Sequence, residues 1–377
     1  MPAPRRLLWI LLAVAAGAII YVIADARDYI RDFGVYQTAA ERALAGEPLY
    51  RADDGFFQYK YWPAFALAMA PFAYLPHEFA KFLWFAISGG LIAWLLALSI
   101  RLLPDRRLSE RALAWWIVLL TGKFIVRELI NGQTNALLAV LVLGALAAIR
   151  QRRTVVAGAL LGAAVFVKPY ALVLIPWLAV TQGVAALLAS VAVLAAGLLL
   201  PAGIYGWQGN LTLLADWYRT VSSTTTDMLA VRENMSFASM YAKWLGAGSA
   251  AYLLALASTV AAGALAIVVW WRRDRAHHPE YLEVGLLLVL VPLISPQGWD
   301  YVLLLGTPAL VCLIDRFREL SVPWRLATAA GFLLTSLMLF DVYRRSVYIA
   351  LTEGGALTVG GILLAVSLAR LRSTSLA

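Results

Sequence analysis

The sequence has few of the residues from which metal and disulfide sites are built. Its 1 cysteine, Cys312, excludes an internal disulfide framework and a zinc cluster of the thiolate type. Its 3 histidines argue against a histidine-rich metal site, and we predict neither a metal ion nor a cofactor. Charged residues are also scarce, at 14% of the chain, whereas hydrophobic residues make up 62%. Most of this chain therefore cannot form a water-soluble globule.

Long apolar segments recur from one end of the chain to the other, and the mean hydropathy is +0.77. We predict an all-α polytopic membrane protein with a single domain, residues 1–377, and about twelve transmembrane helices. The first span, Leu7–Ala24, resembles a signal peptide but is too long for one, which favours an uncleaved anchor. Segments 155–167 and 170–182 fall short of the roughly 20 residues needed to cross a bilayer. The candidate spans are 7–24, 79–100, 112–126, 134–149, 155–167, 170–182, 184–204, 249–271, 281–295, 300–315, 325–340 and 356–370.

The distribution of basic residues predicts the orientation in the membrane. If both termini are cytoplasmic, 17 of the 31 lysines and arginines lie on cytoplasmic flanks, as the positive-inside rule requires. The net charge of +9 is thus explained by topology, and we predict no nucleic-acid partner. The expected location is the plasma membrane (a bacterial inner membrane), with membrane lipids around the protein.

Two long segments fall on the predicted extracytoplasmic side. The first, 25–77, contains an amphipathic stretch and an apolar stretch, 61–75, that is too short to span comfortably; we interpret these as interfacial or re-entrant helices. The second segment, 205–245, is rich in Trp, Tyr, Ser and Thr and is predicted to be a loop.

Several polar residues in these segments can carry chemistry. Asp32 lies just beyond the first span, where partial desolvation raises a carboxyl pKa and improves a general base; a solvated ion pair with Arg31 is the simpler interpretation. Adjacent Asp53 and Asp54 beside Gly55 suggest a turn more than a magnesium site.

A polar patch also separates two spans near the middle of the chain. It contains Lys123, Arg127, Asn131 and Gln133, whose amides suit sugar hydroxyls or phosphate oxygens if the patch is not a simple turn. Lys168 is the one charge between Gly158 and Trp177, and an ionisable residue in an apolar segment is a functional candidate by default. A compact ammonium suits phosphate, although a snorkelling lysine is the alternative.

Further polar candidates lie in the second half of the chain. Asn234 ends the second extracytoplasmic segment, and Trp299, Asp300 and Tyr301 form a polar stretch between two spans. Asp300 beside aromatic residues can bind a sugar, but it can equally cap the following helix.

Four of these stretches together resemble glycosyltransferase family 87 of the GT-C superfamily, whose best-known members are polyprenol-phosphate-mannose-dependent mannosyltransferases. The stretches are Asp32-Phe33-Gly34-Val35-Tyr36 with Gly46-Glu47-Pro48-Leu49-Tyr50; Tyr59-Lys60-Tyr61-Trp62-Pro63; Asn131-Gly132-Gln133-Thr134-Asn135 with Lys168-Pro169-Tyr170; and Ser295-Pro296-Gln297-Gly298-Trp299-Asp300-Tyr301. The chain departs from the family pattern at Trp62, where a second proline is usual, and it lacks the histidines that some relatives place after Trp299.

The resemblance implies a GT-C-type helical bundle and a catalytic aspartate just after the first membrane helix, which matches Asp32. It implies a polyprenyl-phosphate sugar as donor and a glycolipid or glycan as acceptor, with no metal. We then expect Lys168, Arg127 and Lys123 to stabilise the departing phosphate. The expected sugar and acceptor ligands are Tyr36, Tyr61, Trp62, Asn131, Gln133, Asn234, Trp299, Asp300 and Tyr301.

Two other functions remain open at this point. A transporter or flippase of a lipid-linked or small polar substrate also has many spans, but it places polar groups near the bilayer midplane and often has repeated halves. A polysaccharide polymerase or ligase has a similar span count and uses a lipid-diphosphate donor.

Overall fold

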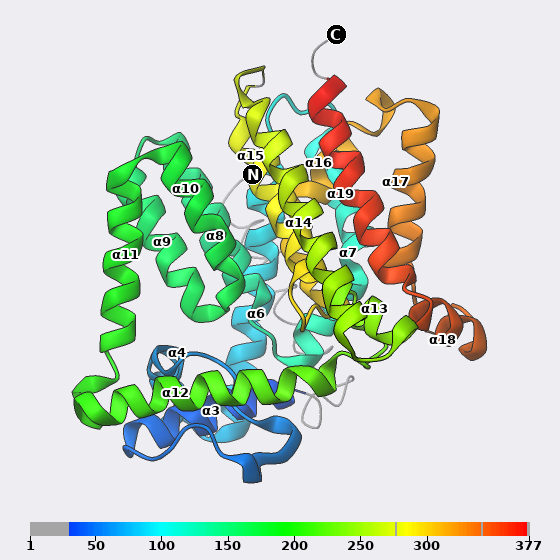
Figure 1. Ribbon diagram of the computed structural model, residues 1–377. Helices are drawn as coiled ribbons and strands as arrows, with labels where there is room; N and C mark the ends of the chain where they lie inside the picture. The colour runs from blue at the N-terminus through cyan, green and yellow to red at the C-terminus, as the bar shows by residue number, and fades with distance from the viewer. Residues whose placement is uncertain (1–29, 276, 341, 375–377) are drawn as a thin grey trace.

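The computed structural model describes residues 30–275, 277–340 and 342–374, which are almost entirely helical and contain no β-strand. The predicted first span, 7–24, lies outside the described residues. Figure 1 shows a bundle of roughly parallel helices whose ends on one side are crossed by a long helix, α12 (Ala202–Met228). Helix α3 (Arg31–Leu44) lies on the side of α12 away from the bundle, and α4 (Pro63–Ala68) packs against α12, α9 and α11. The remaining α-helices of the bundle and its margins are α5 (Ala70–Ala73), α6 (His77–Arg101), α7 (Glu110–Asn131), α8 (Asn135–Arg150), α9 (Thr154–Val167), α10 (Leu174–Gln182), α11 (Val184–Leu199), α13 (Phe237–Leu245), α14 (Ser249–Trp271), α15 (Pro279–Ile294), α16 (Thr307–Asp315), α17 (Val322–Thr335), α18 (Arg345–Glu353) and α19 (Ala356–Thr374).

Most predicted spans coincide with helices of the structure, but few of these helices are long and apolar enough to cross a membrane alone. Within the described ranges, α6 and α14 are by themselves long and apolar enough to cross a membrane, and the number rises to 5 if each bent helix pair is one span. The bent pairs are α7 with α8 (118°), α11 with α12 (90°) and α18 with α19 (61°). The protein therefore has helices that can span a membrane, whereas the predicted count of twelve is not confirmed.

Small residues let the helices of one half of the bundle approach closely. A Cβ at Gly158 of α9 would lie 2.1 Å from the carbonyl oxygen of Ala186 in α11, so this crossing requires glycine. Ser190 of α11 donates a hydrogen bond to the Gly158 carbonyl at 2.8 Å. Such glycine and serine contacts are the usual way in which apolar helices associate within lipid.

The two long segments on the predicted extracytoplasmic side differ in how well the sequence anticipated them. The stretch 61–75 does form short helices, α4 and α5, which are broken at Met69 and too short to span. The prediction that 205–245 is a loop was wrong, because most of it continues α12. Gly206 adopts φ 69° within this helix and lets the chain turn from α11 into the crossing direction.

Candidate active site

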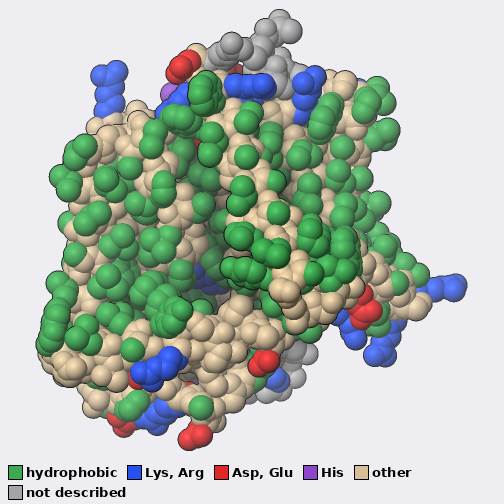
Figure 2. Space-filling view, viewed as in Figure 1, with side chains coloured by type: hydrophobic (Ala, Val, Ile, Leu, Met, Phe, Trp, Pro, Cys, Tyr) green, Lys and Arg blue, Asp and Glu red, His purple; other side chains and the backbone are tan. Residues whose placement is uncertain are grey.

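A cavity of about 870 Å³ opens at the end of the bundle that α12 crosses. Figure 2 shows a hollow in the viewed side of the molecule, next to the end that α12 crosses. It lies between the half formed by α8–α11 and the half that contains α14 and α15, and basic side chains are visible inside it. The walls come from α3, η1 (Ala52–Phe57), the stretch 58–61, the α7–α8 turn, η2 (Pro169–Val173), α12 and the segment 291–301. The cavity is lined by these predicted site residues: Asp32, Tyr36, Tyr61, Arg127, Asn131, Gln133, Lys168, Trp299 and Tyr301.

Asp32 occupies the first turn of α3 and faces this cavity. The side-chain amide of Gln133 donates a hydrogen bond to its carboxylate. Burial raises the pKa of Asp32, while the Gln133 hydrogen bond and the charges of Lys168 and Lys60 act in the opposite direction. A carboxylate that is both partly desolvated and held by a hydrogen bond is suited to accept a proton from a hydroxyl.

Lys168 lies at the other end of the same hydrogen-bond chain. Its ammonium donates to the side-chain oxygens of Gln133 at 2.9 Å and Asn135 at 2.8 Å. Asn135 in turn donates to buried Glu128 at 2.7 Å, and the backbone N–H of Ala136 donates to the other oxygen of that carboxylate at 2.8 Å. Asp32 and Lys168 are thus joined through Gln133, and Lys168 is fixed by a network rather than snorkelling freely.

Local sequence explains why these side chains converge. Helix α7 ends at Asn131 because Gly132 takes the left-handed conformation, φ 71°, that residues with a Cβ rarely adopt. Helix α8 begins at Asn135, so only residues 132–134 separate the two helices and Gln133 lies in a tight turn that faces the cavity. Helix α9 ends before Lys168 because Pro169 cannot continue a helix.

Aromatic rings form part of the cavity wall. The hydroxyls of Tyr36 and Tyr61 lie 2.8 Å apart, and their rings pack edge to face with centroids 4.9 Å apart. The rings of Trp299 and Tyr301 are nearly parallel, at 6° and 6.2 Å. Such flat apolar faces beside polar groups are typical of sites that orient polyhydroxylated ligands.

Four predicted site residues lie outside the cavity lining. Lys123 forms a buried ion pair with Asp300 at 2.7 Å, and Arg127 approaches the same carboxylate at 3.7 Å. Lys123 is therefore engaged by Asp300 and not presented to a phosphate, and Asp300 holds cations rather than facing a sugar. Of Lys123, Arg127 and Asp300, only Arg127 lines the cavity.

Trp62 and Asn234 support the cavity from behind. Trp62 stacks on Trp217 of α12, with ring centroids 3.7 Å apart. The amide of Asn234 donates to the carbonyl oxygens of Met228 at 3.0 Å and Pro296 at 2.7 Å, and so ties the end of α12 to the 295–301 segment. Both residues position wall segments instead of contacting the cavity.

Some residues that the structure places in or behind the cavity were given no role of their own from the sequence. Glu128 and Asn135 belong to the same polar patch as Gln133, in which charged and amide side chains separate two apolar spans. Lys60 and Tyr170 also line the cavity. In the described ranges, no group of three or more His, Cys, Asp or Glu side chains is placed to hold a metal ion, and the metal-free mechanism stays a prediction.

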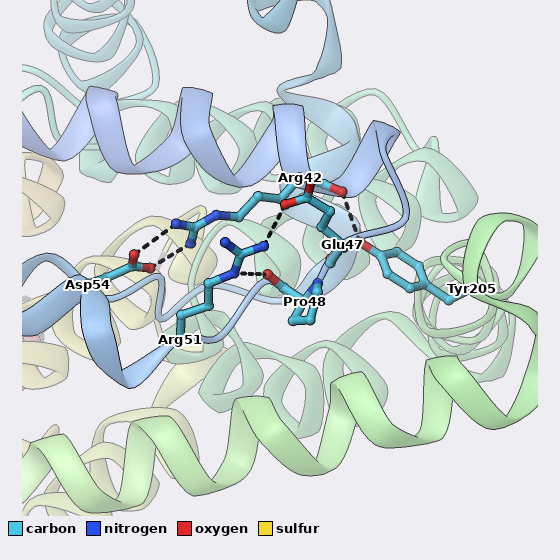
Figure 3. A network of polar contacts seen from close by, with 6 residues as sticks. All are labelled: Arg42, Glu47, Pro48, Arg51, Asp54 and Tyr205. Atoms are coloured by element: carbon cyan, nitrogen blue, oxygen red, sulfur yellow. Dashed lines mark hydrogen bonds and ion pairs between the residues drawn. The ribbon is translucent and has the colours of Figure 1, made fainter.

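Ion pairs stabilise the segment that carries one wall of the cavity. Figure 3 shows Arg42 of α3 in a two-bond contact with Asp54 of η1, at 2.6 and 2.8 Å, beside an Arg51–Glu47 pair. Arg42 lowers the pKa of Asp54, which keeps this carboxylate charged. The hydroxyl of Tyr205 donates to the Glu47 carbonyl at 2.7 Å and anchors the start of α12 to this loop. Asp54 thus serves the turn that its Asp-Asp-Gly sequence indicated.

Comparison with known proteins places the chain in a family. A family model described as glycosyltransferase family 87 matches residues 59–296, which is more than half of the chain. Asp32 precedes the matched residues and Trp299 follows them. No curated protein and no solved structure shows significant similarity. With a cavity that joins a carboxylate, amides, cations and aromatic rings, and with the family match covering most of its walls, the chain belongs to glycosyltransferase family 87.

Proposed function

We propose that this membrane glycosyltransferase transfers a sugar from a polyprenyl-phosphate donor to a hydroxyl of a lipid or glycan acceptor on the extracytoplasmic face. Mannose is the proposed sugar, because the best-known members of the family transfer it. The proposal depends on one observation: a single cavity holds the Asp32 carboxylate, the Lys168 and Arg127 cations and an apolar wall. A polyprenyl-phosphate sugar needs each of these surroundings, since it joins a hydrocarbon chain, an anion and a polyhydroxylated ring.

The proposed reaction is one displacement at the anomeric carbon. The acceptor oxygen bonds to this carbon as the bond to the phosphate oxygen breaks, which inverts the anomeric centre. Asp32 takes the hydroxyl proton as general base. The electron pair of the broken bond stays on the phosphate, and Lys168 and Arg127 stabilise the charge that develops there.

The apolar wall supports a lipid-linked donor. Val173, Val221, Met228, Val291 and Ile294 line the cavity from η2, α12 and α15. Figure 2 shows a hollow between the two halves of the bundle, and hydrophobic side chains cover the surrounding face. A prenyl chain that leaves the cavity by this hollow stays in contact with apolar surface.

The first test is Asp32→Asn with a synthetic polyprenyl-phosphate mannose as donor. We expect transfer to fall by about 10²-fold or more, the usual contribution of a general base, with donor binding and the melting temperature retained. Asp53→Asn is the matched control, because Asp53 is exposed in η1 of the same extracytoplasmic segment and does not line this cavity. Wild-type turnover in the Asp32 variant removes this residue from the mechanism.

The second test addresses the donor class. A polymerase or ligase uses a lipid diphosphate, so we expect transfer from the polyprenyl monophosphate sugar and not from the diphosphate. Preference for the diphosphate contradicts the proposal. Mass spectrometry of glycolipids from membranes with and without the gene then identifies the sugar and narrows the acceptor.

A further inference from the structure

Lys60 lines the cavity and lies in one of the stretches that resemble the family, but nothing above gives its side chain a role. It lies in the Tyr59-Lys60-Tyr61 stretch, whose rings pack with centroids 5.9 Å apart, and its half-buried side chain lines the main cavity. Its carbonyl oxygen accepts a hydrogen bond from the indole N–H of Trp217 at 3.1 Å. The backbone of Lys60 is thus fixed against α12, the helix that contributes Val221 and Met228 to the apolar wall.

The other cations of the proposed phosphate site already have anionic or amide partners. Lys168 donates to Gln133 and Asn135, and Arg127 lies 3.7 Å from an Asp300 oxygen. By contrast, the ammonium of Lys60 makes no hydrogen bond and no ion pair within the part of the chain that the structure describes. Burial lowers the pKa of Lys60, and the charges of Asp32 and Asp227 only partly offset this. An anion in the cavity would relieve the cost of a partly desolvated ammonium without a direct partner.

The position of Lys60 indicates which anion this is. Its charge acts on Asp32, so the ammonium lies near the proposed base, and the Lys60 carbonyl is hydrogen-bonded to the helix that carries part of the apolar wall. A phosphate esterified to a prenyl chain joins an anion directly to a hydrocarbon. We propose that Lys60 binds the phosphate of the lipid-linked donor, and of the polyprenyl phosphate released from it, where the polar floor of the cavity meets the apolar wall.

This inference rests on the proposed function, because it assumes a prenyl-phosphate donor. It adds a third cation to Lys168 and Arg127, so that phosphate contacts come from the first loop as well as from α7 and the α9–η2 junction. The simplest alternative is that Lys60 only tunes the charge of Asp32. The two roles differ in what they predict for a ligand that has phosphate but no sugar.

The test measures direct binding of geranylgeranyl phosphate to the purified full-length protein in detergent. Wild type is compared with Lys60→Met and Lys60→Arg, with geranylgeraniol as the uncharged probe and inorganic phosphate as the headgroup alone. We expect Lys60→Met to weaken binding of the prenyl phosphate about tenfold, as for loss of one charged hydrogen bond, and to leave geranylgeraniol binding unchanged. Lys60→Arg should restore binding to within about threefold of wild type, because it keeps the charge. Arg219→Met is the control, since Arg219 is an exposed cation of α12 that does not line the main cavity.

The outcomes separate this inference from the proposed function. If wild type binds geranylgeranyl phosphate no better than geranylgeraniol, the prenyl-phosphate donor and the role of Lys60 both fail. If wild type prefers the phosphate and Lys60→Met binds it equally well, only the role of Lys60 fails. In that case a shift in the acid limb of the pH–rate profile of Lys60→Met assigns Lys60 to tuning Asp32. Strong binding of inorganic phosphate that Lys60→Met abolishes, with no gain from the prenyl chain, overturns the assignment to a lipid-linked phosphate.

Discussion

Asp32 shows at the scale of one residue how burial and function are coupled. Its raised pKa means that the folded protein holds a proton on this carboxyl more tightly than the unfolded chain does. Ionised Asp32 therefore opposes folding, whereas the protonated form favours it. The stability that the protonated form contributes is fully present at low pH and is lost as the pH rises through the pKa of the folded state. We expect transfer to show the reverse dependence, falling as the pH drops through the same value, because only the ionised form accepts a proton.

This coupling gives a paired prediction for Asp32→Asn. At pH 7 the melting temperature of the variant should equal or exceed that of wild type, because a neutral amide replaces a desolvated charge. The difference should shrink as the pH is lowered through the range in which Asp32 takes up its proton. Thermal unfolding followed at several pH values measures it, and a variant that is clearly less stable at pH 7 contradicts the origin proposed for the pKa shift.

Gly132 is the residue on which the geometry of Gln133 depends. An added Cβ would lie 2.6 Å from Ile30 Cγ2, at a backbone φ of 71°. We expect Gly132→Ala to cost about 1–3 kcal/mol of stability and to reduce transfer, because both the steric overlap and the left-handed backbone strain must be relieved. Gly89→Ala in α6 is the control, since its Cβ would have no neighbour within 4 Å. Equal melting temperatures for the two variants would show that the turn is not strained.

At the scale of elements, α12 is the part of the fold that sequence reasoning misjudged. Its Trp, Tyr, Ser and Thr content suggested an exposed loop, but these residues belong to a helix that crosses the ends of the bundle (Figure 1). The spans near 79–100 and 249–271 were predictable because long apolar runs favour helices in lipid. The Lys123–Asp300 pair joins residues 177 positions apart, and no local pattern could have revealed it.

Trp217 is one contact through which α12 holds the first loop at the site. We expect Trp217→Ala to weaken prenyl-phosphate binding severalfold, because it removes both the stack on Trp62 and the hydrogen bond to the Lys60 carbonyl. Trp207→Ala, at an exposed position near the start of the same helix, should bind as wild type does. Binding titrations compare the two. Equal loss in both variants would indicate general weakening of α12, and no loss in either would show that its contact with the first loop is dispensable.

At the scale of the whole molecule, the candidate site and the arginine-rich turns occupy opposite ends of the bundle. Asp32 and Lys168 meet at the end crossed by α12, and α8, with 16 residues, carries the chain about 24 Å away from it toward Arg150, Arg152 and Arg153. The sequence could assign the arginine clusters to one end of the bundle, because successive spans alternate in direction. The position of Asn131 and Gln133 on the cavity wall could not, because it depends on the 118° bend between α7 and α8.

This arrangement predicts which side of the membrane each end faces. If the positive-inside rule applies, the arginine-rich end is cytoplasmic and the cavity opens on the outer side. The native Cys312 is buried and is the 1 cysteine in the chain, so an introduced cysteine gives a specific label. We expect a membrane-impermeant maleimide to label Glu41→Cys on α3 in intact cells, and to label Gln151→Cys after α8 only when the membrane is opened; both native residues are exposed. The opposite pattern would place Asp32 on the cytoplasmic side and would contradict transfer on the extracytoplasmic face.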